Sequence, residues 1–294
     1  MQTTWQHIPI LAPEIAQLLL TQPNGVYMDG TLGLGGHTKL FLSQLGPQAK
    51  ILGFDKDEQA LAMAVEKVAD ARLVPVHASY TQAPLVLQQQ AIAGVDGALF
   101  DLGLSSYQLD NPARGFSLLR DGPLDMRFDL SARLTAETIV NEWGLADLER
   151  IITDFGEDRH AHAIAMAIMA ARRQGRIDTT GKLKQIVETV LPARGKIHPA
   201  TQTFQALRIA VNDELSCVAQ MTEILPHILK VGARAAVLTF HSLEDRLVKN
   251  HFKTLVAAGD WKLVNKHVIV PSYEEIRHNS RARSAKLRVI ERVK

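Results

Sequence analysis

Short apolar runs alternate with helical patterns through the first hundred residues of the chain. One helical pattern spans about residues 37–45, and another follows the second apolar run and ends at about residue 69. The apolar runs, which predict buried strands, are residues 26–29, 51–55, 73–77 and 98–102. Strands that are separated by helices form a mostly parallel sheet with helices on both faces. The pattern therefore predicts an α/β fold.

This alternation stops after the fourth run and resumes in the last third of the chain. Between them the pattern predicts turns and amphipathic helices, such as 146–155 and 160–173, and no strand. The later elements are predicted helices over about 201–230 and 243–257 and predicted strands over 233–240, 261–270 and 286–293. An all-helical unit, 106–203, inserted into one α/β domain formed by 1–105 and 204–294 explains this order.

The composition of the 294 residues, with 46% hydrophobic and 22% charged residues, excludes disordered, collagen-like and coiled-coil chains. The single cysteine, Cys217, excludes an intramolecular disulfide and a zinc cluster built on cysteines. No apolar run is long enough to span a membrane, and the first residues lack the features of a signal peptide. We therefore expect a soluble cytoplasmic protein with no membrane association, whose oligomeric state the sequence does not indicate.

Charge is unevenly distributed, although the net charge is only +2. Residues 1–100 carry 5 Lys and Arg against 8 Asp and Glu, a balance of −3, whereas residues 241–294 carry 12 against 6, a balance of +6. A second basic stretch contains Arg172, Arg173, Arg176, Lys182, Lys184, Arg194 and Lys196. Two basic patches favour a polyanionic partner, although solvated helix faces would give the same pattern.

A glycine-rich turn, Asp29–His37, lies between the first predicted strand and the first predicted helix. Glycines permit positive φ and close approach of a ligand to the backbone, and the N-terminus of the following helix offers free N–H groups. Asp55 ends the second strand, where a carboxylate can accept both hydroxyls of a ribose or, alternatively, cap the next helix. The pattern predicts a nucleoside cofactor, and both NAD and S-adenosylmethionine fit it.

Two features of this turn favour S-adenosylmethionine. The spacing departs from the dinucleotide motif GxGxxG, because Thr38 stands where a third small residue is expected after Gly33 and Gly35. Asp29, which opens the turn, would repel a pyrophosphate but suits the sulfonium and amino groups of the methyl donor. We therefore expect the methyl donor.

Several longer motifs resemble those of the bacterial ribosomal RNA small subunit methyltransferase H family. They are residues 7–11, 29–37, 101–110, 114–117, 121–127, 198–215, 240–246 and 279–288. The resemblance implies a class I methyltransferase fold, Rossmann-like and mostly parallel, with a helical domain inserted after the fourth strand. It further implies an enzyme that uses S-adenosylmethionine to methylate N4 of a cytidine in the decoding region of 16S ribosomal RNA, with the small ribosomal subunit as partner.

The resemblance also assigns residues that contact the cofactor. Carried over position by position, they are Gly35, Gly36, His37, Asp55, Tyr80, Asp101 and Gln108. Tyr80 follows the third strand, where its ring can stack on adenine. The stretch between Lys253 and Asn279 is shorter than in longer family members, so an RNA contact made there by those members is not implied for this chain.

Methylation of the exocyclic amine requires acceptors for its N–H groups, whereas methylation of carbon 5 of cytosine needs a cysteine thiolate. Cys217 lies within a predicted helix and is expected in the core, which argues against a carbon-5 enzyme. The fourth strand ends in Asp101–Leu104 rather than in the Asp/Asn-Pro-Pro-aromatic sequence common among amino-directed methyltransferases, so the orienting acceptors stay unassigned. The candidate catalytic residues are Asp101, His241 and Ser242. Loop structure that caps the next helix with Ser242 and Glu244 or Asp245 explains His241 and Ser242 equally well.

Other polar residues have both a functional and a structural interpretation. Four basic residues are expected to contact RNA phosphates, namely Arg281, Arg283, Lys286 and Arg288. Asp125 and Arg127 either shape a loop over the cofactor or form a salt-bridged turn, and His198 is either structural or faces RNA. His160 and His162 lack the spacing of ligands on one helix face, so no metal site is expected.

Two other classes of function are weighed against this prediction. A ribosome-assembly protein could keep the cofactor fold without turnover, but a relic pocket has no reason to retain the glycine turn, Asp55 and Asp101 together. A nicotinamide oxidoreductase is disfavoured by the spacing of the glycines and by the lack of an obvious set of hydride-transfer residues.

Overall fold

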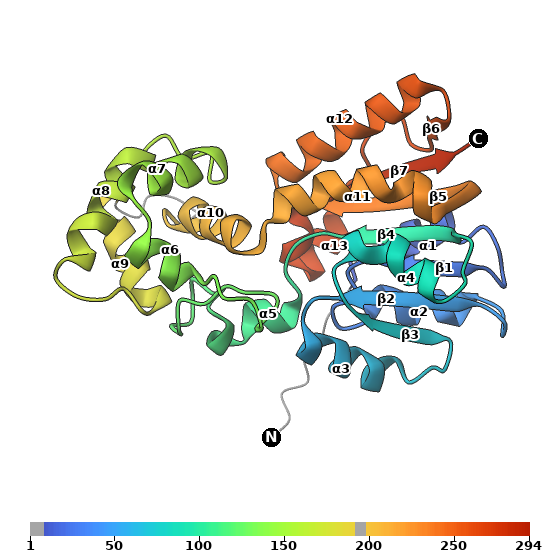
Figure 1. Ribbon diagram of the computed structural model, residues 1–294, viewed down its shortest axis with the longest axis horizontal. Coiled ribbons are helices and arrows are strands. Elements are labelled where there is room, and N and C mark those ends of the chain that lie inside the picture. The colour runs from blue at the N-terminus through green and yellow to red at the C-terminus, as the bar shows by residue number, and fades with distance from the viewer. Residues whose placement is uncertain (1–8, 192–197) are drawn as a thin grey trace. The chain divides into compact units, whose positions relative to one another are not determined.

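The computed structural model describes residues 9–191 and 198–294, and the chain divides into two compact units (Figure 1). The first unit consists of the chain up to Ser105 together with Leu215–Lys294, and the second consists of Ser106–Glu214. The first unit is therefore discontinuous in sequence, with the second unit inserted after its fourth strand.

The first unit contains a seven-stranded sheet in the order β3-β2-β1-β4-β5-β7-β6. Its strands are β1 (Val26–Asp29), β2 (Lys50–Asp55), β3 (Leu73–His77), β4 (Val95–Asp101), β5 (Leu229–Thr239), β6 (Trp261–Leu263) and β7 (Lys286–Arg292). Strands β1 to β5 pair in parallel, whereas β7 pairs antiparallel with both β5 and β6. The prediction of a mostly parallel α/β sheet is confirmed.

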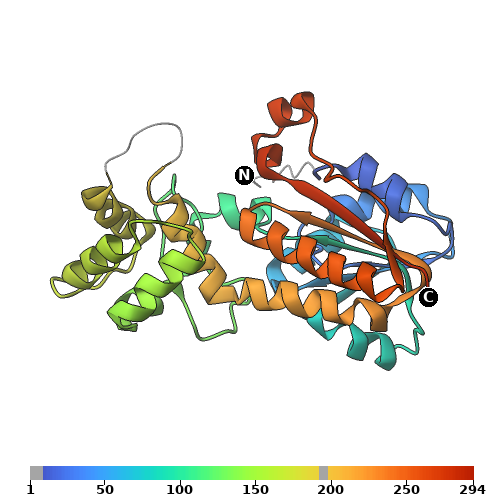
Figure 2. The ribbon, with the colours of Figure 1, turned by 90° about the horizontal axis from the view of Figure 1, so that it is seen from above.

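Helices cover both faces of this sheet, as Figure 2 shows for α1 and α12. One face is covered by α1 (Ala12–Leu19), α2 (Gly36–Gln44) and α3 (Glu58–Val68), and the other by α4 (Ala83–Gln89), α11 (Glu214–Ile228) and α12 (Ser242–Ala258). Side chains alternate between the two cores along each strand, so Leu99 packs on the first face and Phe100 on the second. Burial on both faces explains why the central strands β1 and β4 are mostly apolar.

The predicted strand 261–270 is shorter than expected. β6 ends at Leu263, and Ile269 returns only as an isolated bridge to Leu287. Between them the Asn265 side chain takes over the hydrogen bonding to β7, since its Oδ1 accepts from Val289 N at 2.7 Å and its Nδ2 donates to Leu287 O at 3.2 Å. A side chain thus replaces the backbone partner that a continuing strand would have supplied.

The second unit is helical, as predicted. Its helices are α5 (Ser106–Asp110), α6 (Ala136–Glu142), α7 (Leu145–Asp154), α8 (Ala161–Arg172), α9 (Thr180–Val190) and α10 (Thr201–Asn212). α8 packs on α7 and α9, and α10 packs on α6 and α7. This packing places α10 in the inserted unit, which therefore extends to Glu214 rather than to residue 203. No helix in the described part of the chain is both long enough and apolar enough to cross a bilayer.

The predicted helix 201–230 is interrupted at Asp213, which has φ of +50° and separates α10 from α11. Asp and Asn tolerate this left-handed conformation better than most residues. Local polar contacts hold the break, because the Arg208 guanidinium binds the Glu214 carboxylate at 2.8 and 2.9 Å. The Asn212 side chain also accepts a hydrogen bond from Phe128 N at 2.7 Å.

Candidate functional site

The glycine turn connects β1 to α2 with two residues in left-handed conformations. Gly33 has φ of +52° and Gly35 has φ of +72°. A Cβ atom at Gly35 would lie 2.6 Å from Cγ2 of Val68 in α3, so this position requires glycine both for its dihedral angle and for its close packing. Gly36 begins α2, whose first turn therefore faces the same edge of the sheet as the ends of β1 and β2.

Replacing Gly35 with alanine is expected to lower the free energy of unfolding by about 1–3 kcal/mol, through left-handed strain and overpacking. Urea unfolding measures this change. Gly175→Ala is the matched control, because its φ is not positive and nothing lies within 4 Å of a Cβ there. An equal loss in both variants would show that the turn imposes no special requirement.

The Asp55 carboxylate lies at the end of β2, directly beside this turn. Its Oδ2 accepts from Gly33 N at 2.8 Å and its Oδ1 accepts from Asp57 N at 2.9 Å. The capping role is taken by Asp57, whose Oδ1 accepts from Gln59 N and Ala60 N at the start of α3. Each Asp55 oxygen keeps a further lone pair and the residue is partly exposed, so the site fits the two hydroxyls of a ribose.

Three ionisable side chains meet where β1 and β4 end. Asp29 Oδ2 accepts from the Thr38 hydroxyl at 2.7 Å, so the residue that breaks the GxGxxG spacing is the one that binds the first acid of the turn. His37 Nδ1 lies 3.5 Å from Asp101 Oδ2, and its Nε2 lies 3.0 Å from the carbonyl oxygen of Ile10. A carbonyl only accepts, so Nε2 carries the hydrogen and a neutral His37 presents a lone pair at Nδ1.

Burial shifts the proton affinities of these groups. It lowers the pKa of His37 and raises the pKa of Asp29, which keeps the imidazole neutral. Burial, and then the nearby Glu244 carboxylate, raise the pKa of Asp101 to about 7. Burial likewise raises the pKa of Asp55 to about 6. Asp101 therefore changes charge near neutral pH, and in its protonated form it can donate to the lone pair of His37.

Tyr80 and Gln108 lie in different units. Tyr80 begins a 3₁₀ turn, η1 (Tyr80–Gln82), directly after β3, and its ring is edge-on to Phe100 with centroids 5.4 Å apart. It is half-buried, so part of its ring remains accessible for stacking. Gln108 is a buried residue of α5 in the inserted unit, and its contact with the cofactor stays a prediction. The structure thus brings Gly35, Gly36, His37, Asp55, Tyr80 and Asp101 to one edge of the sheet.

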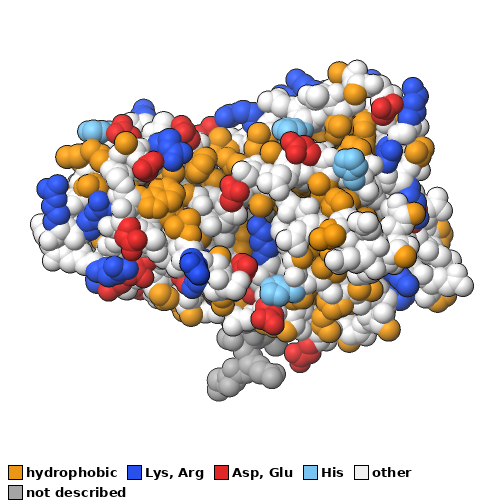
Figure 3. Space-filling model, in the orientation of Figure 1, with side chains coloured by type: hydrophobic (Ala, Val, Ile, Leu, Met, Phe, Trp, Pro, Cys, Tyr) orange, Lys and Arg blue, Asp and Glu red, His pale blue; other side chains and the backbone are white. Residues whose placement is uncertain are grey.

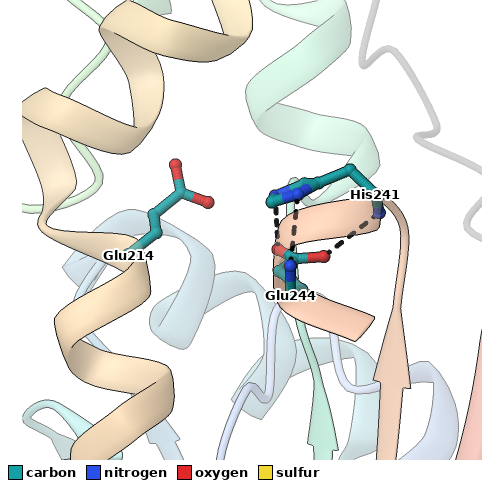
Figure 4. Close-up of side chains that lie close together, drawn as sticks. All are labelled: Glu214, His241 and Glu244. Atoms are coloured by element: carbon teal, nitrogen blue, oxygen red, sulfur yellow. Dashed lines mark hydrogen bonds and ion pairs between the residues drawn. The ribbon is translucent and has the colours of Figure 1, made fainter. Parts of the chain in front are cut away.

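His241 caps α12, as Figure 4 shows. Its Nδ1 accepts from Glu244 N at 3.4 Å, its Nε2 lies 3.0 Å from Glu244 Oε1, and Glu244 Oε2 accepts from Phe240 N at 2.9 Å. Nδ1 is thus engaged in the cap, whereas the buried Nε2 makes no hydrogen bond within the described part of the chain despite its proximity to Glu244; the cap contacts favour the capping interpretation of His241 over a catalytic one. Ser242 is the first residue of the helix. The sequence prediction of a cap that includes Glu244 is confirmed, since a carboxylate three residues after a cap is the signal of a capping box.

Cys217 lies in α11 but is half-buried rather than in the core. Lys56 Nζ lies 3.3 Å from its sulfur, a contact between residues far apart in sequence that the helical pattern could not reveal. The helical placement expected for this cysteine is observed.

The four basic residues near the C-terminus fall into two pairs. Arg281 and Arg283 are exposed on the 3₁₀ turn η3 (Ser280–Ser284). Lys286 and Arg288, on β7, both bind the carboxylate of Asp245 in α12, at 3.2 and 2.8 Å. The prediction that all four contact phosphates therefore has less support for the pair on β7.

Three residues of the second basic stretch are also engaged within the protein. Arg172 donates to the carbonyls of Val140 and Trp143, Arg176 binds Glu137, and Lys182 binds Asp178. Arg194 and Lys196 lie outside the described residues, as do residues 7 and 8 of the first matching motif. On the face shown in Figure 3, lysine and arginine side chains are scattered over the molecule rather than gathered into one patch.

The remaining candidates have structural partners. Arg127 and Asp125 form a salt-bridged turn, with Nη2 and Oδ2 2.7 Å apart. His198 Nε2 lies 2.9 Å from Glu188 Oε1, and its Nδ1 accepts from Ala200 N at the start of α10. His160 pairs with Asp158 and His162 with Glu149, so these two histidines have separate carboxylate partners. These contacts favour the structural interpretation of each residue.

The sheet order and the glycine turn followed by an acid at the end of the next strand define a class I methyltransferase fold. A family model described as the MraW methylase family matches residues 4–293. The chain belongs to this family, and its cofactor is S-adenosylmethionine.

Relatives match over nearly the full length. A protein of Elusimicrobium minutum named ribosomal RNA small subunit methyltransferase H is 57% identical over 98% of this chain and 99% of its own. A protein of the same name from Acetivibrio thermocellus is 43% identical over 98% of this chain and 99% of its own. A solved structure of an rRNA methylase from Streptococcus thermophilus covers 96% of this chain and 94% of its own, with 12% identity and a TM-score of 0.39.

Proposed function

We propose that this protein methylates N4 of a cytidine in the decoding region of 16S ribosomal RNA, with the small ribosomal subunit in the cytoplasm as partner. The observation that carries the proposal is Asp101, a carboxylate at the end of β4 that changes charge near neutral pH beside the predicted cofactor residues. The names of the full-length relatives and the motif resemblance support the RNA substrate.

The cofactor, when bound, supplies an electrophilic methyl group. Asp55 would accept hydrogen bonds from the ribose hydroxyls, Tyr80 would stack on the adenine, and Gln108 would be a further contact. The glycine turn lets the backbone of Gly35 and Gly36 approach the ligand closely. His37, whose ring is held by the Ile10 carbonyl, can accept a hydrogen bond from Asp101 at Nδ1 only while Asp101 is protonated.

Asp101 is the group that we expect to act on the substrate amine. The lone pair of N4 is delocalised into the cytosine ring, so an acceptor for its N–H increases its nucleophilicity as it attacks. In the ionised form, the Asp101 carboxylate can accept that hydrogen bond and then the proton that N4 releases once its bond to the methyl group has formed. Positioning of the amine against the methyl group that the cofactor would supply would account for most of the remaining rate acceleration.

Replacing Cys217 with serine is expected to leave the rate of methylation within about threefold of the wild type, because attack by an amine needs no covalent adduct. Radioactive methyl transfer to ribosomal RNA measures this rate. A loss as large as that caused by removing a nucleophile would contradict the N4 assignment and favour a thiolate mechanism at carbon 5.

Nucleoside mass spectrometry of 16S ribosomal RNA, from cells with and without the gene, tests the proposed function. We expect N4-methylated cytidine at one decoding-region position to disappear with the gene and to return with the wild-type chain, but not with Asp101→Ala. A binding protein without turnover would instead leave the modification unchanged in all strains. Loss of a different modification would show that the target atom is wrong.

A further inference from the structure

The segment between β6 and β7 presents an exposed surface that combines basic and aromatic side chains. We call it the 266–283 surface, and its exposed residues include Lys266, His267, Val270, Tyr273, Arg277, His278, Arg281 and Arg283. Tyr273, the first residue of α13 (Tyr273–His278), is 82% exposed. Figure 2 shows α13 and η3, in red, leading into β7. An aromatic side chain that is this exposed contributes little to the folded core. Its position among several cationic side chains therefore requires a functional explanation.

This surface is firmly anchored to the first unit. Ile276 packs against the core, and Glu275 Oε1 accepts from Leu11 N at 2.7 Å. The Ser272 hydroxyl caps α13 by accepting from Glu275 N at 3.1 Å. Ala282 of η3 is fully buried. The exposed ring therefore stands on a fixed support, so that a ligand stacking on it pays little entropy for ordering the protein.

The charges around Tyr273 suit a polyanion. Arg277 lies four residues after Tyr273 and therefore shares its face of α13. Within the described ranges, neither Arg277 nor Arg283 forms an ion pair, in contrast to Lys286 and Arg288 on β7. Glu275 is directed to the backbone of Leu11, which leaves Glu274 as the exposed acid of the helix.

We propose that Tyr273 is a stacking site for an unpaired base of the RNA substrate, with Arg277 and Arg283 contacting phosphates beside it. The proposal deepens the proposed function and rests on it. An aromatic ring beside arginines is the arrangement by which proteins hold single-stranded nucleic acid, since every base has a face that can stack. Bases within a duplex are already stacked on their neighbours, so this surface selects unpaired segments next to the target.

Binding of RNA by the full-length chain tests this proposal. The probes are a single-stranded RNA oligonucleotide of the decoding-region sequence and the duplex formed with its complement. Tyr273→Ala is expected to weaken single-strand binding about 5- to 100-fold, with a smaller effect on the duplex. Tyr273→Phe keeps the ring and is expected to bind within about twofold of the wild type. Leu85→Ala, at another exposed apolar residue, is the matched control and is expected to bind like the wild type.

The salt dependence of RNA binding distinguishes base stacking on Tyr273 from phosphate contacts made by the arginines. Arg283→Ala is expected to reduce the slope of log K against log salt by about 0.7 for a lost phosphate contact, whereas Tyr273→Ala leaves the slope unchanged. Unchanged affinity in Tyr273→Ala would overturn the proposal, as would a phenylalanine variant as weak as the alanine variant. The proposal would also be overturned if the wild type bound anionic phosphatidylglycerol vesicles more strongly than RNA and Tyr273→Ala lost this binding. That result would favour a membrane surface as the partner. A wild-type chain that binds neither these RNAs nor the small ribosomal subunit would contradict the proposed function itself.

Discussion

Replacing Asp101 with asparagine is expected to slow methyl transfer by about a hundredfold or more, the usual contribution of a positioned proton acceptor. The accepting form is the carboxylate, and its pKa is about 7. In the wild type the rate should therefore rise with pH through about 7 and level off above it. The asparagine side chain does not titrate, so the profile of the variant should lose this step. Single-turnover kinetics between pH 5.5 and 8.5 measure both effects.

Stability provides the control for this variant. Because burial raises the pKa of Asp101 above its ordinary value, the folded chain holds a proton that the unfolded chain has released between about pH 4 and pH 7. This contribution to stability is fully present below that window and is lost as pH rises through about 7. Asp101→Asn should then be at least as resistant to urea as the wild type at pH 8. A variant that is both inactive and less stable would indicate a structural role.

Replacing Asp55 with alanine is expected to weaken binding of the cofactor by about 1–3 kcal/mol, because two ribose hydroxyls lose their acceptor. The carboxylate must be ionised to accept from both, so affinity in the wild type should rise with pH through about 6 and then level off. Titration calorimetry with S-adenosylhomocysteine, which lacks the sulfonium charge, measures this dependence.

Asp147→Asn is the control for Asp55, since it removes an exposed carboxylate from α7 of the inserted unit. It should bind the cofactor like the wild type. Unchanged affinity in Asp55→Ala would show that the ribose is placed wrongly, and measurable binding of NAD would favour the oxidoreductase alternative.

The sequence predicted those elements of the fold whose position along the chain is set by one local feature of the sequence. The strand 26–29 lies between Gly25 and Gly30, and the strands 26–29 and 51–55 both end in an aspartate, so their polar ends are visible in the pattern. The break at Asp213 has no such signal, because Asn, Asp and Glu are all tolerated within helices. The contacts beside it include a hydrogen bond between Asn212 and Phe128, residues that are distant in sequence.

For the candidate site too, the sequence predicted local features but not the contacts between distant segments. The turn at Gly35 and the acid Asp55 were found because spacing along one β-α-β unit determines them. The pairing of Lys286 and Arg288 with Asp245, and of His37 with the Ile10 carbonyl, depends on how the sheet brings separate segments together. A basic stretch in sequence therefore overestimates the charge that remains available to RNA.

The insertion after β4 has a consequence for synthesis of the chain. β4 must find its parallel partner β5, which begins at Leu229 and emerges only after the whole inserted unit has been made. Until then, one edge of β4 has no strand beside it, and the apolar residues that pack under α11 and α12 have no cover. Such long-range pairing is slow, and open apolar edges favour aggregation. Premature termination within the insert should thus yield a nascent chain that depends on chaperones, whereas the inserted unit itself is continuous and can fold as it is made.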